Sequence, residues 1–442
     1  MLTAFAGAFR TPDLRKKLLF TLGVIVVYRI GSVIPVPNVD VGVLHTCVNN
    51  AQSGTQAGLY SVMSLMSGGA LLQLAIFALG IMPYITASII LQLLTVVIPR
   101  LEALKKEGQS GTNQITQYTR YLTLVLAVLQ STVFVTLARN DQLIQGCPAA
   151  GSGLHLLHSQ SIFPVIVMIL TMTAGSGVIM WLGELITERG VGNGMSVLIF
   201  TQICATFPQA LWAIKQSRPG SQGWVIFLLV IAIGLAVMLG IIFIEQAQRR
   251  IPVQYAKKMV GRRVLGGTTT YIPLKVNQAG VIPVIFSSSL LYIPYLYAQF
   301  RPNGWGASWI QGHLVKGDHP VYMAIFFFLT LFFTYFYVSI TFNPEEVADN
   351  MKKYGGFIPG IRAGRPTEDY LGYVLNRLTF PGSLYLGIIA LLPMIAIAFL
   401  SGANQNFPFG GTSVLIIVGV GLDTVKQIES QLQQRNYEGF LR

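Results

Sequence analysis

Side chains that could carry out catalysis are few in this sequence, and their spacing matches no enzyme motif. The chain has no HExxH zinc motif, no paired-cysteine metal motif and no phosphate-binding GxxxxGK[ST] loop. Histidine is the usual general base and a common metal ligand. All five histidines lie in predicted outer loops: His45, His155, His158, His313 and His319. We therefore expect no catalytic residue, no metal and no cofactor, and an intramembrane protease is disfavoured.

Charged residues are equally sparse in the apolar segments. A proton- or ion-coupled transporter would place ionisable side chains within its membrane helices. Here Glu184 and Glu245 fall at the inner ends of apolar stretches, and Asp423 falls near the end of the last one. Arg29 lies near the outer end of the first stretch, where its guanidinium can reach the interface. A secondary transporter with inverted repeats is the alternative function, but the sequence lacks the polar mid-membrane site that it would need.

Isoleucines recur in the apolar segments at helical spacing. Ile81 and Ile85 are four residues apart, as are Ile199 and Ile203, so each pair lies on one face of a helix. Taken by themselves, such residues are ordinary packing residues.

The elements that must hold these residues are membrane helices. Of the 442 residues, 52% are hydrophobic and 11% are charged, whereas a soluble domain is about 25% charged. A bilayer-spanning helix needs about 20 apolar residues. Ten windows fit: 17–34, 71–98, 121–138, 161–182, 195–214, 224–244, 279–298, 320–342, 381–400 and 409–422. The sequence predicts an all-α polytopic membrane protein of ten helices.

The distribution of Lys and Arg predicts the orientation, because short basic loops stay in the cytoplasm. With the N-terminus inside, 24 of the 30 basic residues are cytoplasmic and 5 are outside. Both termini are therefore expected in the cytoplasm. The first window has a basic flank but no small-residue cleavage site, so we expect a retained helix and not a signal peptide. The net charge of +13 follows mostly from the inner loops, where anionic lipid or a bound partner would be attracted.

Ten helices divide into two groups of five, 1–218 and 219–442. An odd number per half makes the second half enter the bilayer from the opposite side, so inverted repeats fit the topology. The longest polar stretches are two basic cytoplasmic loops, about 245–278 and 343–376.

Residues 61–69 form a short apolar segment that ends at Gly68 and Gly69, where the backbone can turn freely. An interfacial segment and a short helix folded back into a cavity both fit, since non-helical backbone at membrane depth must be buried in protein or face water. The glycines would then lead into a span beginning near Leu71, which Pro83 is expected to bend. Cys47 and Cys147 both fall in outer loops, where an oxidising compartment could join them or leave two free thiols.

Several long stretches resemble the SecY family, the channel subunits of the bacterial Sec protein translocase. They run in order along the chain: FALGIMPYITASIILQLL (77–94), WLGELITERGVGNGMSVLIF (181–200), QRRIPVQYAKK (248–258), KVNQAGVIPVIFSSSLL (275–291), NPEEVADNMKKYGGFIPGIRAGRPTEDYL (343–371) and GGTSVLIIVGV (410–420).

This resemblance implies two inversely related five-helix halves around a pore that opens across the bilayer and sideways into lipid. It also assigns residues to parts of the channel. The pore ring would comprise Ile81, Ile85, Ile199, Ile203, Ile285 and Ile416. The plug, about 59–72, would include Tyr60, Met63, Leu65, Met66, Ser67, Gly68 and Gly69. The lateral gate would include Thr86, Gln92, Ser289 and Ile293.

The resemblance further implies that the basic loops receive the SecA motor ATPase or a translating ribosome. The arginines concerned would be Arg249, Arg250, Arg262, Arg263 and Arg362. Other expected partners are the SecE and SecG subunits, signal sequences, unfolded polypeptides and membrane lipid. The expected location is the bacterial cytoplasmic membrane, and work would come from SecA, the ribosome or the proton-motive force.

Overall fold

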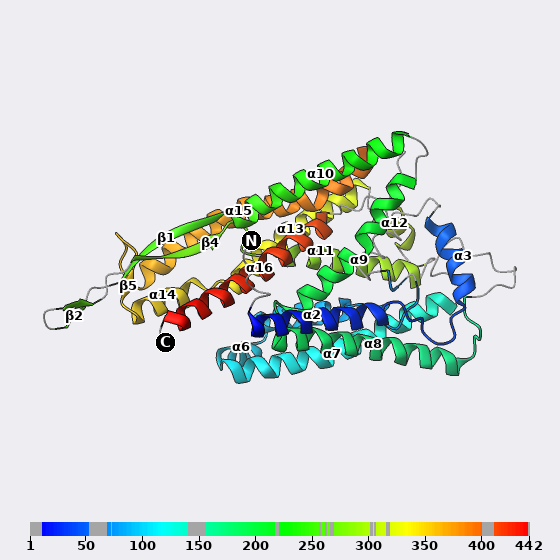
Figure 1. Ribbon diagram of the computed structural model, residues 1–442, viewed down its shortest axis with the longest axis horizontal. Helices are drawn as coiled ribbons and strands as arrows, with labels where there is room; N and C mark the ends of the chain where they lie inside the picture. The colour runs from blue at the N-terminus through cyan, green and yellow to red at the C-terminus, as the bar shows by residue number, and fades with distance from the viewer. Residues whose placement is uncertain are drawn as a thin grey trace. The chain divides into compact units, whose positions relative to one another are not determined.

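Long helices dominate the computed structural model of the chain (Figure 1). It describes residues 11–52, 69–71, 73–139, 156–216, 221–255, 258–260, 263–265, 269–300, 304, 306–314, 319–399 and 411–440. Each of the ten predicted windows overlaps a helix. These helices are α2 (Pro12–Gly31), α5 (Met82–Val97), α7 (Gln109–Arg139), α8 (Ile162–Arg189), α9 (Gly194–Gln216), α10 (Ser221–Gln246), α11 (Ile282–Phe300), α13 (Pro320–Thr341), α15 (Arg365–Phe399) and α16 (Gly411–Phe440).

Five of the described helices are long and apolar enough to cross a membrane, and the number rises to six if the bent pair α5 and α6 (Pro99–Lys106) is one span. The helical, multi-pass membrane fold is confirmed, while the count of ten spans stays a prediction. Other described helices are short: α3 (Val41–Gln52), α12 (Ala307–His313) and α14 (Pro344–Lys353).

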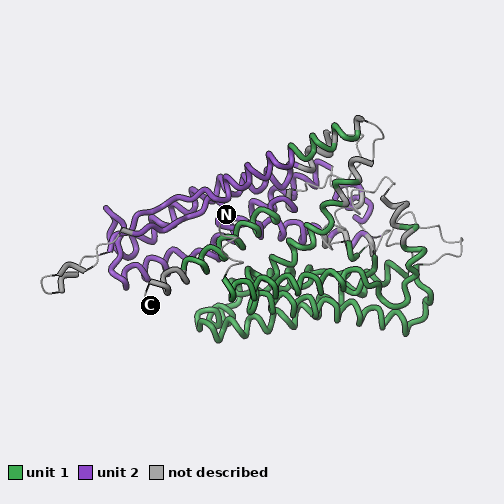
Figure 2. The backbone as a smooth tube through the Cα atoms, viewed as in Figure 1, with its two compact units in different colours: residues 1–232, 400–409, 416–442 green, residues 233–399, 410–415 purple. Residues whose placement is uncertain are grey.

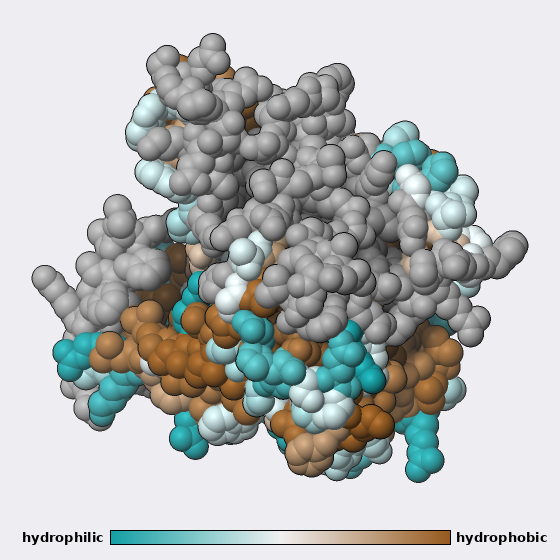
Figure 3. Space-filling view, turned by 90° about the vertical axis from the view of Figure 1, so that its right-hand side faces the viewer, coloured by the Kyte–Doolittle hydropathy of each residue, from teal (hydrophilic) through white to brown (hydrophobic). Residues whose placement is uncertain are grey.

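Apolar side chains are exposed along the long helices, as a protein in lipid requires. On α7, Tyr121 and Leu129 are each 59% exposed, and on α8 Phe163 is 76% exposed. Polar side chains turn inward on the same helices. Thr123 and Ser131 of α7 are fully buried, and a hydrogen bond of 3.1 Å joins the hydroxyl oxygens of Ser131 and Thr173 of α8. Broad hydrophobic patches are visible on the coloured part of the surface in Figure 3.

The chain divides into two compact units (Figure 2). Unit 1 comprises residues 1–232, 400–409 and 416–442, and unit 2 comprises 233–399 and 410–415. Most of α16 therefore packs in unit 1, where buried Ile428 clusters with Leu14 and Val191. The division into halves at residue 218 stays a prediction about the inverted repeat.

The second span was predicted to begin near Leu71, and this was wrong. Residues 73–81 form turns interrupted by an isolated β-bridge between Ala75 and Pro35, and α5 begins only at Met82. Pro83 lies in the first turn of α5, where a proline lacks no needed hydrogen bond. It therefore belongs to the first turn of the helix and does not bend it. The sharp bend comes later, a 99° change of direction between α5 and α6, because Pro99 restricts Ile98 to extended backbone.

The two basic loops contain β-structure that the sequence did not predict. β1 (Gln248–Tyr255) pairs antiparallel with β4 (Thr269–Lys275) and with β5 (Gly356–Phe357), giving the order β4-β1-β5. A second two-stranded sheet joins β2 (Lys258–Val260) and β3 (Arg263–Leu265). In β1 the alternating residues Ile251 and Val253 are buried, in a cluster with residues of α14 and α15. The sheet thus ties the two loops of unit 2 into one structure.

Candidate functional site

The irregular segment before α5, residues 73–81, is mostly buried although it lacks the continuous i→i+4 hydrogen bonds of an α-helix. Leu74 and Ala75 have no exposed surface. The backbone N–H of Val36 donates to the Leu74 carbonyl at 2.8 Å, and that of Ile76 donates to the Ile34 carbonyl at 2.9 Å. These bonds satisfy backbone groups that would otherwise be costly to bury in an apolar setting.

Helix α8 presses directly against this segment at a glycine. A Cβ atom placed on Gly175 would lie 2.1 Å from the Ile76 carbonyl oxygen. On the other side, the ring of Phe77 occupies the space where a side chain at Gly31 would lie. The segment therefore fits between α2 and α8 only because these two positions have no side chain.

Three of the predicted pore-ring residues meet at the end of this segment. Ile81, the N-cap residue of α5, is 2% exposed and belongs to a core cluster. Ile85 and Ile199 are partly buried and pack against the same cluster. The structure thus brings Ile81 and Ile85 together with Ile199 of α9 in unit 1, and we call these three residues the isoleucine cluster.

The other three predicted ring residues are not members of this core cluster as the structure describes it. Ile203 of α9 is 4% exposed and Ile416 of α16 is 6% exposed, both in unit 1. Ile285 of α11 is partly buried and belongs to unit 2. Closure of all six into one ring stays a prediction.

Gly69 is the predicted plug residue that the structure describes. Its φ of +84° lies in the left-handed region, which glycine adopts without strain. A Cβ atom there would lie 4.0 Å from Cγ2 of Thr206, one turn beyond Ile203 on α9. The other predicted plug residues lie outside the described part of the chain: Tyr60, Met63, Leu65, Met66, Ser67 and Gly68.

The predicted gate residues lie on two helices. Thr86 and Gln92 are on α5 of unit 1, and Ser289 and Ile293 are on α11 of unit 2. The Thr86 hydroxyl donates to the Met82 carbonyl of its own helix at 3.0 Å. The Ser289 hydroxyl oxygen is buried without a hydrogen-bond partner among the described residues. Their pairing across a gate, and the side-chain position of Ile293, stay predictions.

An ion pair that the sequence did not reveal joins α7 and α8. The Arg120 guanidinium donates to both carboxylate oxygens of Glu184 at 2.8 Å, and to the side-chain oxygen of Gln117 at 2.9 Å. Bidentate pairs of this kind fix geometry as well as charge. The sequence placed Glu184 at an inner helix end, but its partner is 64 residues away and no local pattern signals it.

Arg249 and Arg250 are exposed at the start of β1. Arg362 is exposed in a turn bounded by Gly360 and Gly364, which have φ values of +85° and +106°. Buried Thr367 donates its hydroxyl to the Arg362 carbonyl at 2.8 Å. The backbone under Arg362 is therefore held in place while its side chain faces outward. Arg262 and the side chain of Arg263 lie outside what the structure describes.

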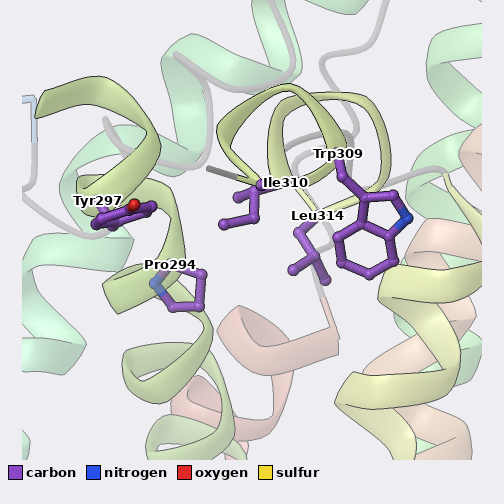
Figure 4. A pocket seen from close by; sticks show the side chains of 6 residues that line it. Pro294, Tyr297, Trp309, Ile310 and Leu314 are labelled. Atoms are coloured by element: carbon purple, nitrogen blue, oxygen red, sulfur yellow. The ribbon is translucent and has the colours of Figure 1, made fainter. Parts of the chain in front are cut away.

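A cavity of about 710 Å³ lies in unit 2 between α11 and α12 (Figure 4). It is lined by Pro294, Tyr297, Gly306, Trp309, Ile310 and Leu314. It contains none of the predicted site residues. Cys47 is fully buried in α3, whereas Cys147 lies outside the described residues, so their pairing stays a prediction. No group of three metal-ligating side chains occurs within the described residues.

The long apolar helices with inward polar faces, and the buried irregular segment that ends in an isoleucine cluster, define a polytopic helical membrane protein. The family model for SecY matches residues 75–425. A SecY protein translocase subunit from Streptomyces griseus is 68% identical over 444 residues, and one from Mycobacterium tuberculosis is 57% identical over 450 residues; each match covers all of both chains. This chain belongs to the SecY family, and the resemblance seen in its sequence is confirmed.

Solved structures with the same fold are also channels by description. A protein-conducting channel superposes with a TM-score of 0.63 at 19% identity, covering 94% of this chain and 92% of that one. Sec61 in a canine ribosome-channel complex gives a TM-score of 0.58 at 18% identity, covering 94% and 92%. A SecY structure concerned with its plug domain gives a TM-score of 0.60.

Proposed function

We propose that this protein is the channel subunit of a Sec translocase, which moves unfolded secretory polypeptides across the membrane and releases apolar segments sideways into lipid. Membership of the SecY family carries this proposal. The isoleucine cluster at the junction of α5 and α9 supports it, because aliphatic side chains form a constriction that resists wetting and blocks ions. Each elementary charge that leaks down the membrane potential would release about 2.3 kcal/mol per 100 mV.

The small-solute transporter is the weaker alternative. It would need a charged or polar substrate site among the apolar helices. The bidentate Arg120–Glu184 pair is satisfied by its own members and by Gln117, so it serves to join two helices. The apolar composition of the isoleucine cluster favours a seal around a polypeptide instead.

Crosslinking a translocating chain tests this function. A stalled secretory precursor would be loaded onto reconstituted protein that carries a photoreactive probe at Ile85, Ile199 or Ile285. We expect each probe to crosslink to the precursor, because these residues are partly exposed and would line its path. A probe at Ile388, which is 57% exposed on α15, is the control. The assignment fails if the three probes crosslink no better than the control.

The proposal extends to partners and location. The protein would sit in the bacterial cytoplasmic membrane with both termini in the cytoplasm, beside SecE and SecG, and would bind SecA or a ribosome. It would not itself be an enzyme. The driving work would come from SecA, from elongation of the polypeptide by the ribosome, or from the proton-motive force. The exposed arginines on the sheet of unit 2 support contact with an acidic partner, since ribosomal RNA attracts such side chains through its phosphates.

Arg362→Glu should strongly impair SecA-driven transport. The substitution reverses a charge on an anchored turn without removing a buried contact, so we expect the protein to accumulate in the membrane normally. Transport of a precursor into inverted vesicles measures the effect. Arg377→Glu is the control, since Arg377 packs over the Tyr373 ring of α15 with 5.3 Å to its centroid. Equal transport by the two variants would contradict the role of Arg362.

A further inference from the structure

A buried hydrogen bond connects α2 to α9 beside the isoleucine cluster. The Gln202 side-chain nitrogen donates to the Tyr28 hydroxyl oxygen. Tyr28 is 1% exposed and Gln202 is 2% exposed, so both side chains are removed from solvent and lipid. The Tyr28 ring also stacks on Phe77, with 5.8 Å between ring centroids.

This bond lies against a hydrophobic core cluster. The cluster that holds Tyr28 consists otherwise of side chains without polar atoms: Val24, Phe77, Ile81, Ile179, Leu182, Ile186 and Leu198. Aliphatic contacts are non-directional, so they allow packed helices to rotate or slide relative to each other. A single buried polar contact is directional and can fix one register, as a lone polar residue does in a coiled coil.

The position of Gln202 on α9 links this contact to the predicted ring. Gln202 lies between Ile199 and Ile203, and the helical repeat places it roughly 60° from the first and 100° from the second. Leu198, which is fully buried in the same cluster, lies on the Gln202 side. The face that carries Gln202 is thus held toward α2, and this determines where the two isoleucines point.

We propose that Tyr28 and Gln202 are positioning residues that fix the rotation of α9, and that they thereby set the aperture and ion selectivity of the isoleucine constriction. The second part rests on the proposed channel function. The first part concerns only the orientation of a helix and can be tested without transport.

Cys204 provides a native reporter of that rotation. It lies two residues after Gln202, and therefore nearly on the opposite side of α9. It is a free, partly exposed thiol. Any rotation of α9 that follows loss of the Tyr28 contact would change its exposure to a membrane-permeant maleimide. The labelling rate can be measured by mass spectrometry of the peptide that carries Cys204.

The test compares Tyr28→Phe, Gln202→Leu and the double variant in purified, reconstituted protein. Each single variant removes one partner and should lower the melting temperature, because a buried polar group left unpaired is costly. The double variant removes both polar groups and should regain most of that stability. If the bond only contributed stability, the double variant would also regain normal labelling and normal resting ion conductance.

We expect instead that the double variant keeps an altered Cys204 labelling rate and a raised resting conductance. The change should be about fivefold, which is the shift in a two-state equilibrium produced by losing one hydrogen bond of typical net strength. Tyr121→Phe, at a 59% exposed position on α7, is the control. Wild-type labelling of Cys204 in the double variant would overturn the positioning role. Altered labelling with wild-type conductance would keep the helix orientation but overturn the effect on the constriction, whereas failure of the channel function itself would appear in the precursor crosslinks.

Discussion

Gly175→Ala is expected to destabilise the protein by about 2 kcal/mol or more, the upper part of the usual range for overpacking. The added Cβ atom would lie 2.1 Å from the Ile76 carbonyl oxygen and 3.1 Å from Ile76 Cγ2. A clash with backbone cannot be relieved by a change of rotamer. The segment that leads to Ile81 would therefore have to move away from α8. A thermal melt of the detergent-solubilised protein, together with its accumulation in membranes, measures the effect.

Gly177→Ala is the matched control on the same helix. Its Cβ atom would lie 3.6 Å from a methyl group of Leu124, which is an ordinary contact. Alanine also favours helix over glycine by about 1 kcal/mol. We expect the control to melt at or above the wild-type temperature. Similar melting temperatures for the two alanine variants would refute the proposed close contact between α8 and the irregular segment.

Ile285→Asn and Ile416→Asn should each raise the ion conductance of the resting channel and weaken its selectivity for signal sequences. An amide in an aliphatic constriction binds water and lowers the dehydration barrier that ions meet. Every 1.4 kcal/mol by which the barrier falls raises the conductance about tenfold. Planar-bilayer recordings without a precursor, together with transport of a precursor with a defective signal sequence, measure the two effects.

Leucine at the same two positions separates polarity from shape. Ile285→Leu and Ile416→Leu keep the apolar character and volume of the side chain, so we expect resting conductance close to that of the wild type. Ile416 is 6% exposed, so its asparagine variant also needs a check that the protein still folds. If the asparagine variants fold normally and their resting ion conductance is as low as that of the leucine variants, the result would argue against a hydrophobic seal.

The apolar composition predicted the helical membrane fold well, because transfer of about 20 apolar residues into lipid depends on sequence alone. The course of the chain through 73–81 could not be predicted in this way. Its residues are as apolar as those of α5, so hydropathy does not distinguish them. Pairing with residues 34–36 and the contact at Gly175 made these residues irregular, and neither contact is visible in a local pattern.

The sheet in the basic loops was missed for a related reason. Alternation of buried Ile251 and Val253 is a strand signal, but it covers only a few residues in a polar loop. The sheet is completed by β5, where Gly356 pairs with Tyr255 of β1, about a hundred residues earlier in the chain. A pairing across that distance depends on α14 and α15 bringing the second loop back to the first.

The sequence by itself determined the class of this protein, its apolar helices and the family motifs that carry the predicted pore-ring isoleucines. The class and the helices follow from side-chain type and spacing, which the folded state does not alter, whereas the ring assignment follows from the resemblance to the SecY family. Only the tertiary structure decided that Ile81 caps a helix, that Pro83 lies in its first turn, and that Tyr28 and Gln202 share a buried hydrogen bond across 174 residues of chain. The reason is physical: contacts between distant segments select one backbone course among several that the local sequence permits equally well.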